Sequence, residues 1–190
     1  MPYNPAIHNR HSIRLPGYDY TQPGAYYLTI LAHKKEHLFG QVVDGEVKLS
    51  PVGEIVQEQW LQIPRHFSNV VLDAFVIMPN HMHGIVVITK GEVHTGIPIR
   101  LESTTSQSHT QSESLATPPI LGSEPGSLPA IVQNLKSVRS RKINKLLKTP
   151  GPTIWHRNYY EHVIRDEADF ERVVTYIESN KVGRSQQVRV

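Results

Sequence analysis

Two histidines, one tyrosine and one asparagine have residue types and spacings that a metal-assisted reaction could use. His81 and His83 are two residues apart, a spacing that in an extended strand places both imidazoles on one side of a sheet, close enough to share an ion. Tyr176 and Asn180 are four residues apart, so on a helix their side chains lie one above the other. Each pair alone has an ordinary explanation, since a chain with 11 histidines forms such pairs by chance and a tyrosine beside an apolar helix stripe commonly serves packing.

The positive charge of the chain is concentrated in its last third. The formal net charge is +3, yet 12 of the 20 Lys and Arg residues and only 6 of the 17 Asp and Glu residues fall within 128–190. Six cations follow one another there with no acidic residue between them: Lys136, Arg139, Arg141, Lys142, Lys145 and Lys148. Such a run is typical of a contact with nucleic-acid phosphates, and it is equally typical of a solvated helix face.

The composition limits the classes of protein and of site. With 38% apolar and 19% charged residues, we expect residues 1–190 to form one globular domain rather than a disordered or membrane-spanning chain. Residues 1–24 lack the organisation of a secretory signal, so we expect a cytoplasmic protein. The chain has no cysteine, which excludes disulfides, thiolate zinc sites and thiol catalysis. A metal ion would therefore need His, Asn, Asp or Glu ligands.

The first part of the chain contains strand, turn and helix patterns. Residues 25–32 are rich in aromatic and β-branched side chains and predict a buried strand. Asp44-Gly45 lies between two short β-prone runs and predicts a two-residue hairpin turn. Apolar residues recur at helical spacing over 51–63, which predicts a core-facing helix capped by Ser50.

The second part of the chain contains two strands, an insertion and two helices. Residues 70–78 and 83–88 predict an antiparallel pair with the histidines at the start of its second strand. Ser, Thr, Gln and Pro supply 16 of the 27 residues in 101–127, which predicts a flexible insertion within the domain. Helix signals follow from Ser127, where the helix carries the basic run, and from Asp166. This order of elements predicts an α+β sandwich, an antiparallel sheet with helices on one face.

Four ordered segments together resemble the REP-associated tyrosine transposases, a family within the HUH endonuclease superfamily. The segments are Gly17-Tyr18-Asp19-Tyr20 with Pro23-Gly24-Ala25-Tyr26, then Ala74-Phe75-Val76-Ile77-Met78-Pro79-Asn80-His81-Met82-His83-Gly84, then Trp155-His156-Arg157-Asn158-Tyr159-Tyr160-Glu161-His162, and finally Tyr176-Ile177 with Asn180. The resemblance covers most of the chain, and the ordered set is far more specific than any one segment.

The resemblance implies a fold and a set of site residues. The implied fold is ferredoxin-like or RRM-like, with helices packed on one face of the sheet. His81 and His83 match the family's paired metal ligands, Asn180 its third ligand and Tyr176 its nucleophile. The implied ion is Mg²⁺ or Mn²⁺, whereas two histidines alone would favour zinc or a later transition metal. The implied reaction cleaves single-stranded DNA without ATP and leaves a 5′-phosphotyrosine and a free 3′-hydroxyl.

The resemblance also implies a partner, namely single-stranded palindromic DNA that folds into hairpins, and therefore a nucleoid-associated location. We expect phosphate contacts from the basic helix, and charge or stacking surfaces near the tyrosine helix. The expected residues are Lys136, Arg139, Arg141, Lys142 and Lys145, together with Arg157, Tyr159, Tyr160 and Arg165. Trp155 and Tyr160 are equally compatible with core positions. Both a monomer and a homodimer are compatible with the sequence.

Two other functions remain open from the sequence. The first is a domesticated DNA-binding protein that keeps hairpin recognition with little or no cleavage. Lys181 follows Asn180 where the family usually has proline, which favours this alternative, whereas the complete set of two histidines, tyrosine and asparagine opposes it. The second is an RNA-binding ferredoxin-like module, which the lack of an aromatic strand pattern of the RNA-recognition type disfavours.

Overall fold

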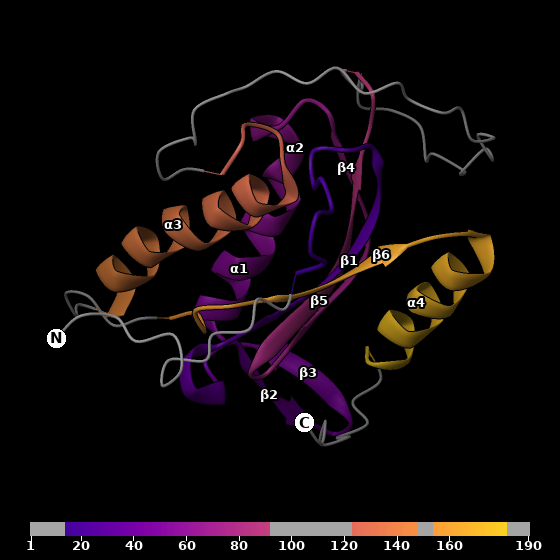
Figure 1. Ribbon diagram of the computed structural model, residues 1–190. Coiled ribbons are helices and arrows are strands. Elements are labelled where there is room, and N and C mark those ends of the chain that lie inside the picture. The colour runs from indigo at the N-terminus through magenta and orange to yellow at the C-terminus, as the bar shows by residue number, and fades with distance from the viewer. Residues whose placement is uncertain (1–13, 92–122, 148–153, 182–190) are drawn as a thin grey trace, which may run out of the picture.

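A four-stranded antiparallel sheet forms the centre of the protein. The computed structural model describes residues 14–91, 123–147 and 154–181 (Figure 1). The strands of the sheet are β1 (Gly24–Leu31), β4 (Val70–Met78), β5 (His81–Ile88) and β6 (Tyr160–Ile164), in the spatial order β4-β5-β1-β6. All neighbouring pairs are antiparallel. This is the strand order of a ferredoxin-like fold, so the predicted α+β class and antiparallel sheet are confirmed.

Helices cover both faces of this sheet. The helices α1 (Pro51–Leu61) and α3 (Leu128–Leu147) lie on one side, with the short α2 (Ile63–His66) following α1, and α4 (Glu167–Ser179) lies on the opposite side (Figure 1). The expectation that all helices pack on one face is therefore wrong for α4. The reason is visible in the central strands, which are apolar on both faces and so require cover on both.

Alternate residues of β5 divide the core into two clusters. Met82, Val86 and Ile88 point into the larger cluster with α1 and α3, and Ile85 and Val87 point into a smaller cluster with α4. We call these two sides of the sheet the α1–α3 face and the α4 face.

Glycine at position 84 is a steric requirement of the α1–α3 face. A Cβ atom at Gly84 would lie 2.3 Å from Cζ2 of Trp60, which is fully buried on α1. Because real Cβ atoms do not approach that closely, the indole can pack against β5 at this position only where the strand has no side chain. Gly84 therefore fixes the distance between α1 and the strand that carries the two histidines.

The local signals for the hairpin and for two helix starts are confirmed. Strands β2 (Gly40–Val43) and β3 (Glu46–Leu49) pair through Asp44 and Gly45, whose φ angles are +53° and +81°. Ser50 Oγ accepts the Gly53 N–H at 3.1 Å and caps α1. Asp166 Oδ1 accepts the Asp169 N–H at 2.8 Å and caps α4. A short 3₁₀ turn, η1 (His33–Lys35), links β1 to this hairpin.

Other features of the chain differ from expectation or are not described. Strand β6 was not predicted, because five residues in an aromatic and charged segment give a weak periodic signal. The described α3 begins at Leu128, as the signal at Ser127 predicts. Most of the predicted insertion at 101–127 lies outside the described residues. In the described ranges, no helix combines the length and the apolar character needed to cross a lipid bilayer.

Candidate active site

Two neighbouring histidine rings lie at the start of β5 on the α4 face. His81 Nε2 and His83 Nε2 are 3.1 Å apart, and the two ring centroids are 4.7 Å apart. Met82, between them in sequence, is buried on the α1–α3 face. The period of two in the strand thus brings both rings together, as the spacing of the histidines predicts.

The other nitrogen of each ring contacts a neighbouring polar side chain. His81 Nδ1 lies 2.6 Å from Asn80 Oδ1. His83 Nδ1 lies 2.7 Å from the Tyr27 hydroxyl and 2.9 Å from the Thr29 hydroxyl. These contacts turn both Nε2 atoms toward each other and hold the rings in one orientation.

Burial favours the neutral form of both imidazoles. His83 is 3% exposed, and burial, with a smaller effect of the neighbouring His81, lowers the pKa of its ring to about 3. Burial also lowers the pKa of His81. A neutral imidazole has a lone pair on one nitrogen, so the pair can act as acceptors of a proton or as ligands of a metal ion.

Tyr176 reaches this pair from α4. Its ring centroid lies 5.4 Å from that of His83 and 6.3 Å from that of Tyr27. Val173 and Ile177 form the buried side of the same helix, which leaves Tyr176 at the edge of that side and 43% exposed. The phenol is therefore accessible to a large substrate and lies next to the histidines at the same time.

The two tyrosines beside His83 differ in environment. Tyr27 is partly buried within the sheet, and burial raises the pKa of its hydroxyl to about 12. Its hydroxyl is also engaged by His83 and Thr29. Tyr176 has the exposed ring, so it is the better placed of the two for attack on a polymer.

Asn180 stands at the C-cap of α4, one turn beyond Tyr176. Its Nδ2 donates to the Tyr176 backbone oxygen at 2.7 Å. The structure thus brings three of the four predicted site residues into one cluster, while the amide of the fourth contacts the backbone of its own helix. This hydrogen bond uses the NH₂ group, so the amide oxygen remains the atom that could ligate a metal ion.

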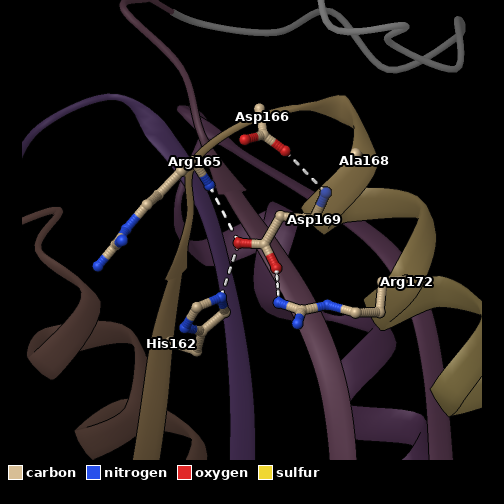
Figure 2. A pocket seen from close by; sticks show the side chains of 6 residues that line it. All are labelled: His162, Arg165, Asp166, Ala168, Asp169 and Arg172. Carbon is tan, nitrogen blue, oxygen red and sulfur yellow. Dashed lines mark hydrogen bonds and ion pairs between the residues drawn. The ribbon is translucent and has the colours of Figure 1, made fainter.

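A polar network attaches the first turn of α4 to β6 (Figure 2). His162 Nε2 lies 2.7 Å from Asp169 Oδ2, the Arg165 N–H donates to the same oxygen at 3.3 Å, and the Arg172 guanidinium donates to Oδ1. The hydrogen bonds from Arg172 and then from His162 lower the pKa of Asp169 to about 2. Asp169 thereby holds the helix that carries Tyr176 against the sheet.

These side chains line a shallow depression of about 430 Å³. The Arg165 side chain points away from the Asp169 carboxylate (Figure 2). Arg165 is exposed, and its expected contact with DNA stays a prediction.

Lys136 has a structural role that the sequence reasoning missed. Its ammonium group contacts three backbone oxygens in the segment before β6, those of His156 at 3.0 Å, Arg157 at 3.3 Å and Asn158 at 3.1 Å. Burial, and then the nearby Arg14, lowers its pKa to about 8. Lys136 therefore ties α3 to the segment that leads into β6.

Four other cations of the basic helix are expected to contact DNA. Their backbone lies on α3, but the side chains are outside the described part of the structure: Arg139, Arg141, Lys142 and Lys145.

The two adjacent tyrosines expected to contact DNA have opposite environments. Tyr159 is 7% exposed, and its hydroxyl has no hydrogen-bond partner among the described residues, so the expectation that it offers a stacking surface is wrong. Tyr160 is 48% exposed and pairs with Thr29, which places it on the α4 face at the edge strand. Arg157 is also exposed. Trp155 is a core residue at 4% exposure.

Sequence reasoning missed Tyr27 and Thr29 as neighbours of the site. Both lie on β1, where the register pairs Thr29 with His83. The signal that could have found them is their alternation with the apolar residues Leu28 and Ile30. That signal becomes informative only once the pairing of β1 with β5 is known.

Comparisons with known proteins identify a relative by sequence and solved structures that resemble the fold. No protein-family model matches the chain. An uncharacterised protein of Haemophilus influenzae is 37% identical over 184 residues, which is 95% of this chain and 92% of that protein.

Two solved structures resemble the fold. The first is a REP-associated tyrosine transposase bound to a REP hairpin, with a TM-score of 0.52, 14% identity, and coverage of 88% of this chain and 72% of that one. The second is a protein from Deinococcus radiodurans proposed to be a transposase, with a TM-score of 0.45, 16% identity, and coverage of 90% and 98%. The chain therefore belongs to the family of the Haemophilus influenzae protein, and its fold is that of a REP-associated tyrosine transposase.

Proposed function

We propose that this protein is a metal-dependent single-strand DNA endonuclease and strand transferase that acts on palindromic, hairpin-forming DNA through a 5′-phosphotyrosine at Tyr176. The observation that carries the proposal is the half-exposed Tyr176 ring beside a pair of neutral histidines, 5.4 Å from the ring of His83. The shared fold with a transposase solved bound to a REP hairpin supports the choice of DNA as substrate.

The donor set fits a divalent metal ion. Two nitrogens that each lie about 2.1 Å from one ion are about 3 Å apart when they occupy neighbouring coordination positions. The 3.1 Å between His81 Nε2 and His83 Nε2 matches this separation. These two nitrogens and the amide oxygen of Asn180 would hold the ion, for which we propose Mg²⁺ or Mn²⁺. When bound, the ion would supply electrophilic stabilisation of the negative charge on a phosphodiester.

The proposed reaction is a transesterification in which the number of phosphoester bonds is conserved. The Tyr176 oxygen attacks phosphorus, its proton leaves to solvent, and the bond from phosphorus to the 3′-oxygen breaks. The 3′-oxygen takes up a proton and becomes a free hydroxyl, while the 5′-phosphate stays on Tyr176. A 3′-hydroxyl can later attack this phosphotyrosine, which rejoins DNA and restores the phenol without ATP.

The exposed side chains around the site suggest the path of the DNA. Tyr160 offers an aromatic surface on the same face as the histidines, at the open edge of the sheet. Base stacking on such a ring suits an unpaired strand, because every base has a π face. Arg165 would add a phosphate contact nearby. Arg157 lines a pocket with residues of α3, so Arg157 and the cations of α3 would contact phosphates farther along the strand. Monomers and homodimers are both compatible with this path.

The test is a covalent-adduct assay with end-labelled hairpin DNA and Mn²⁺ or Mg²⁺. A 5′-phosphotyrosine predicts that a 3′-labelled oligonucleotide migrates with the protein on a denaturing gel. A 5′-labelled one should instead yield a shorter free product that a polymerase can extend. Tyr176→Phe should abolish both products. Tyr26→Phe is the matched control, because the Tyr26 hydroxyl donates to the Gln22 backbone oxygen at 2.7 Å and its ring packs on the α1–α3 face.

The same assay separates cleavage from binding alone. Hairpin binding by the wild-type protein with no adduct in either metal would contradict the proposal and support a DNA-binding protein without nuclease activity. Binding that is stronger for RNA than for DNA would contradict the proposed substrate.

A further inference from the structure

We propose that Tyr27 and Thr29 are positioning residues for the histidine pair, whose hydroxyls hold the His83 ring and let it carry its proton on either nitrogen. This inference rests on the proposed function, because it concerns how the same pair of rings would accept a metal ion. It adds two residues that lie on a different strand from the histidines.

The contacts of His83 come from two neighbouring positions on one face of β1. Thr29 is the register partner of His83, and Tyr27 lies two residues before it on the same face. The Tyr27 hydroxyl is 2.7 Å and the Thr29 hydroxyl 2.9 Å from Nδ1 of His83. The Tyr27 ring also stacks on the imidazole, with centroids 5.5 Å apart and an interplanar angle of 24°. The ring of His83 is therefore fixed by stacking and by hydrogen bonds.

The proton on His81 is assigned by its neighbour. Asn80 Oδ1 can only accept a hydrogen bond, so His81 Nδ1 is the protonated nitrogen and its Nε2 carries a lone pair. The 3.1 Å contact between the two Nε2 atoms is then a hydrogen bond only if His83 carries its proton on Nε2. In that arrangement Nδ1 of His83 accepts from a hydroxyl of Tyr27 or Thr29.

Metal ligation by both rings requires a different arrangement of the same protons. Both Nε2 atoms must then be unprotonated, so the proton of His83 must reside on Nδ1. From there it can donate to the oxygen of Tyr27 or Thr29, once that hydroxyl rotates its own proton away. One proton moves from Nε2 to Nδ1 through solvent and none is lost, so both forms of the ring are neutral.

Hydroxyl groups suit this exchange better than the groups that usually orient a histidine ligand. A carboxylate or a backbone carbonyl only accepts, and so it stabilises the ring with the proton on Nδ1 alone. A hydroxyl donates or accepts, and so it satisfies Nδ1 in both arrangements. The pair of Tyr27 and Thr29 thus keeps His83 aligned before and after a metal ion binds.

The direct test is the position of the His83 ring proton, read by long-range ¹H–¹⁵N NMR on protein with labelled histidine. We expect the metal-free wild-type protein to carry the proton on Nε2 of His83, and the Mg²⁺-bound protein to carry it on Nδ1. His81 should keep its proton on Nδ1 in both states. A His83 ring with the same tautomer with and without Mg²⁺ would overturn the inference.

The second readout is metal affinity in the absence of DNA. We expect the double variant Tyr27→Phe, Thr29→Val to bind Mn²⁺ about 10- to 100-fold more weakly, the usual cost of removing a partner that orients a ligand. Tyr26→Phe is the matched control on the other face. The double variant Tyr27→Phe, Thr29→Ser keeps a hydroxyl at position 29, so it should bind Mn²⁺ more tightly than the variant with valine there and recover most of the lost affinity. Unchanged Mn²⁺ affinity in a folded double variant would also overturn the inference.

These readouts do not depend on cleavage. A wild-type protein that binds Mg²⁺ with the expected change of tautomer but forms no DNA adduct would contradict the proposed function and support the inference. A protein that forms the adduct while its double variant binds Mn²⁺ like the wild type would support the proposed function and contradict the inference.

Discussion

The two faces of the sheet use the same strands for different purposes. On the α1–α3 face, β5 contributes Met82, Gly84 and Val86, which pack against Trp60 and the rest of the large core. On the α4 face, the first residues of the same strand are His81 and His83, which contact polar groups instead. One strand thus packs only apolar or small residues on the α1–α3 face, whereas on the α4 face it begins with the two histidines and continues with the apolar Ile85 and Val87.

The helices on the two faces are also attached differently. The helices α1 and α3 bury many large side chains, whereas α4 covers a smaller apolar cluster and is held at its first turn by Asp169, His162 and Arg172. A helix with less apolar cover depends more on polar contacts for its position. The placement of Tyr176 should therefore be sensitive to changes that leave the main core intact.

The largest expected effect separates the two faces at adjacent positions. His83→Ala should reduce adduct formation by more than about 100-fold. The reason is that removing a residue that only orients a metal ligand already lowers metal affinity or activity by about 10- to 100-fold. Met82→Ala should instead lower the free energy of unfolding by about 2–5 kcal/mol. Urea denaturation and the adduct assay on both variants measure the two effects. A large loss of stability in His83→Ala with cleavage intact would break the comparison.

Gly84→Ala should disturb the α1–α3 face and, through it, the histidines. The added methyl would overlap the indole of Trp60, so we expect a loss of about 1–3 kcal/mol in the free energy of unfolding. Trp60→Phe in the same chain should recover part of this loss by making room. An alanine variant as stable as the wild type would show that the indole is not held against the strand.

Asp169→Asn should weaken the attachment of α4 with a defined pH dependence. Because its partners lower the folded-state pKa of Asp169 to about 2, its carboxylate stabilises the protein above the unfolded-state pKa near 4. This stabilisation is lost as the pH falls through 2. Thermal unfolding should therefore show a lower Tm for the variant at pH 5 to 7, and the difference should shrink between about pH 4 and pH 2. A Tm difference that stays constant between about pH 4 and pH 2 would show that the Asp169 carboxylate is not the ionisable group responsible.

The smallest effects come from a matched pair of helix caps. Ser50→Ala and Asp166→Ala each remove an N-cap, so each should cost about 1 kcal/mol of stability. Only Asp166→Ala should also slow adduct formation, because it loosens the helix that carries Tyr176. Equal adduct rates in the two variants would mean that α4 keeps its position without its cap.

Local signals in the sequence predicted much of this molecule. The turn at Asp44-Gly45 and the caps at Ser50 and Asp166 depend on contacts between residues close in sequence, and the structure shows each of them. The shared face of His81 and His83 follows from the period of the strand alone. These features need no knowledge of how distant segments pair.

Features that depend on distant segments were missed or misplaced. The amphipathic stripe of α4 shows that the helix packs on something, but not which face of the sheet receives it. Tyr27 and Thr29 become neighbours of His83 only through the register of β1 with β5. Lys136 belongs to a basic run, and its contacts with backbone oxygens before β6 depend on the packing of α3. The sequence pattern identified two histidines, a tyrosine and an asparagine as candidate site residues. It did not identify the side chains that contact them.

The most direct measurement of the central claim is to identify the residue that carries the DNA. The covalent adduct would be trimmed with a nuclease, digested with a protease and analysed by mass spectrometry. The expected result is a nucleotide mass on the peptide that contains Tyr176, the exposed tyrosine of helix α4. A nucleotide on the peptide of Tyr27 or Tyr160 instead would contradict the assignment of Tyr176 as the nucleophile.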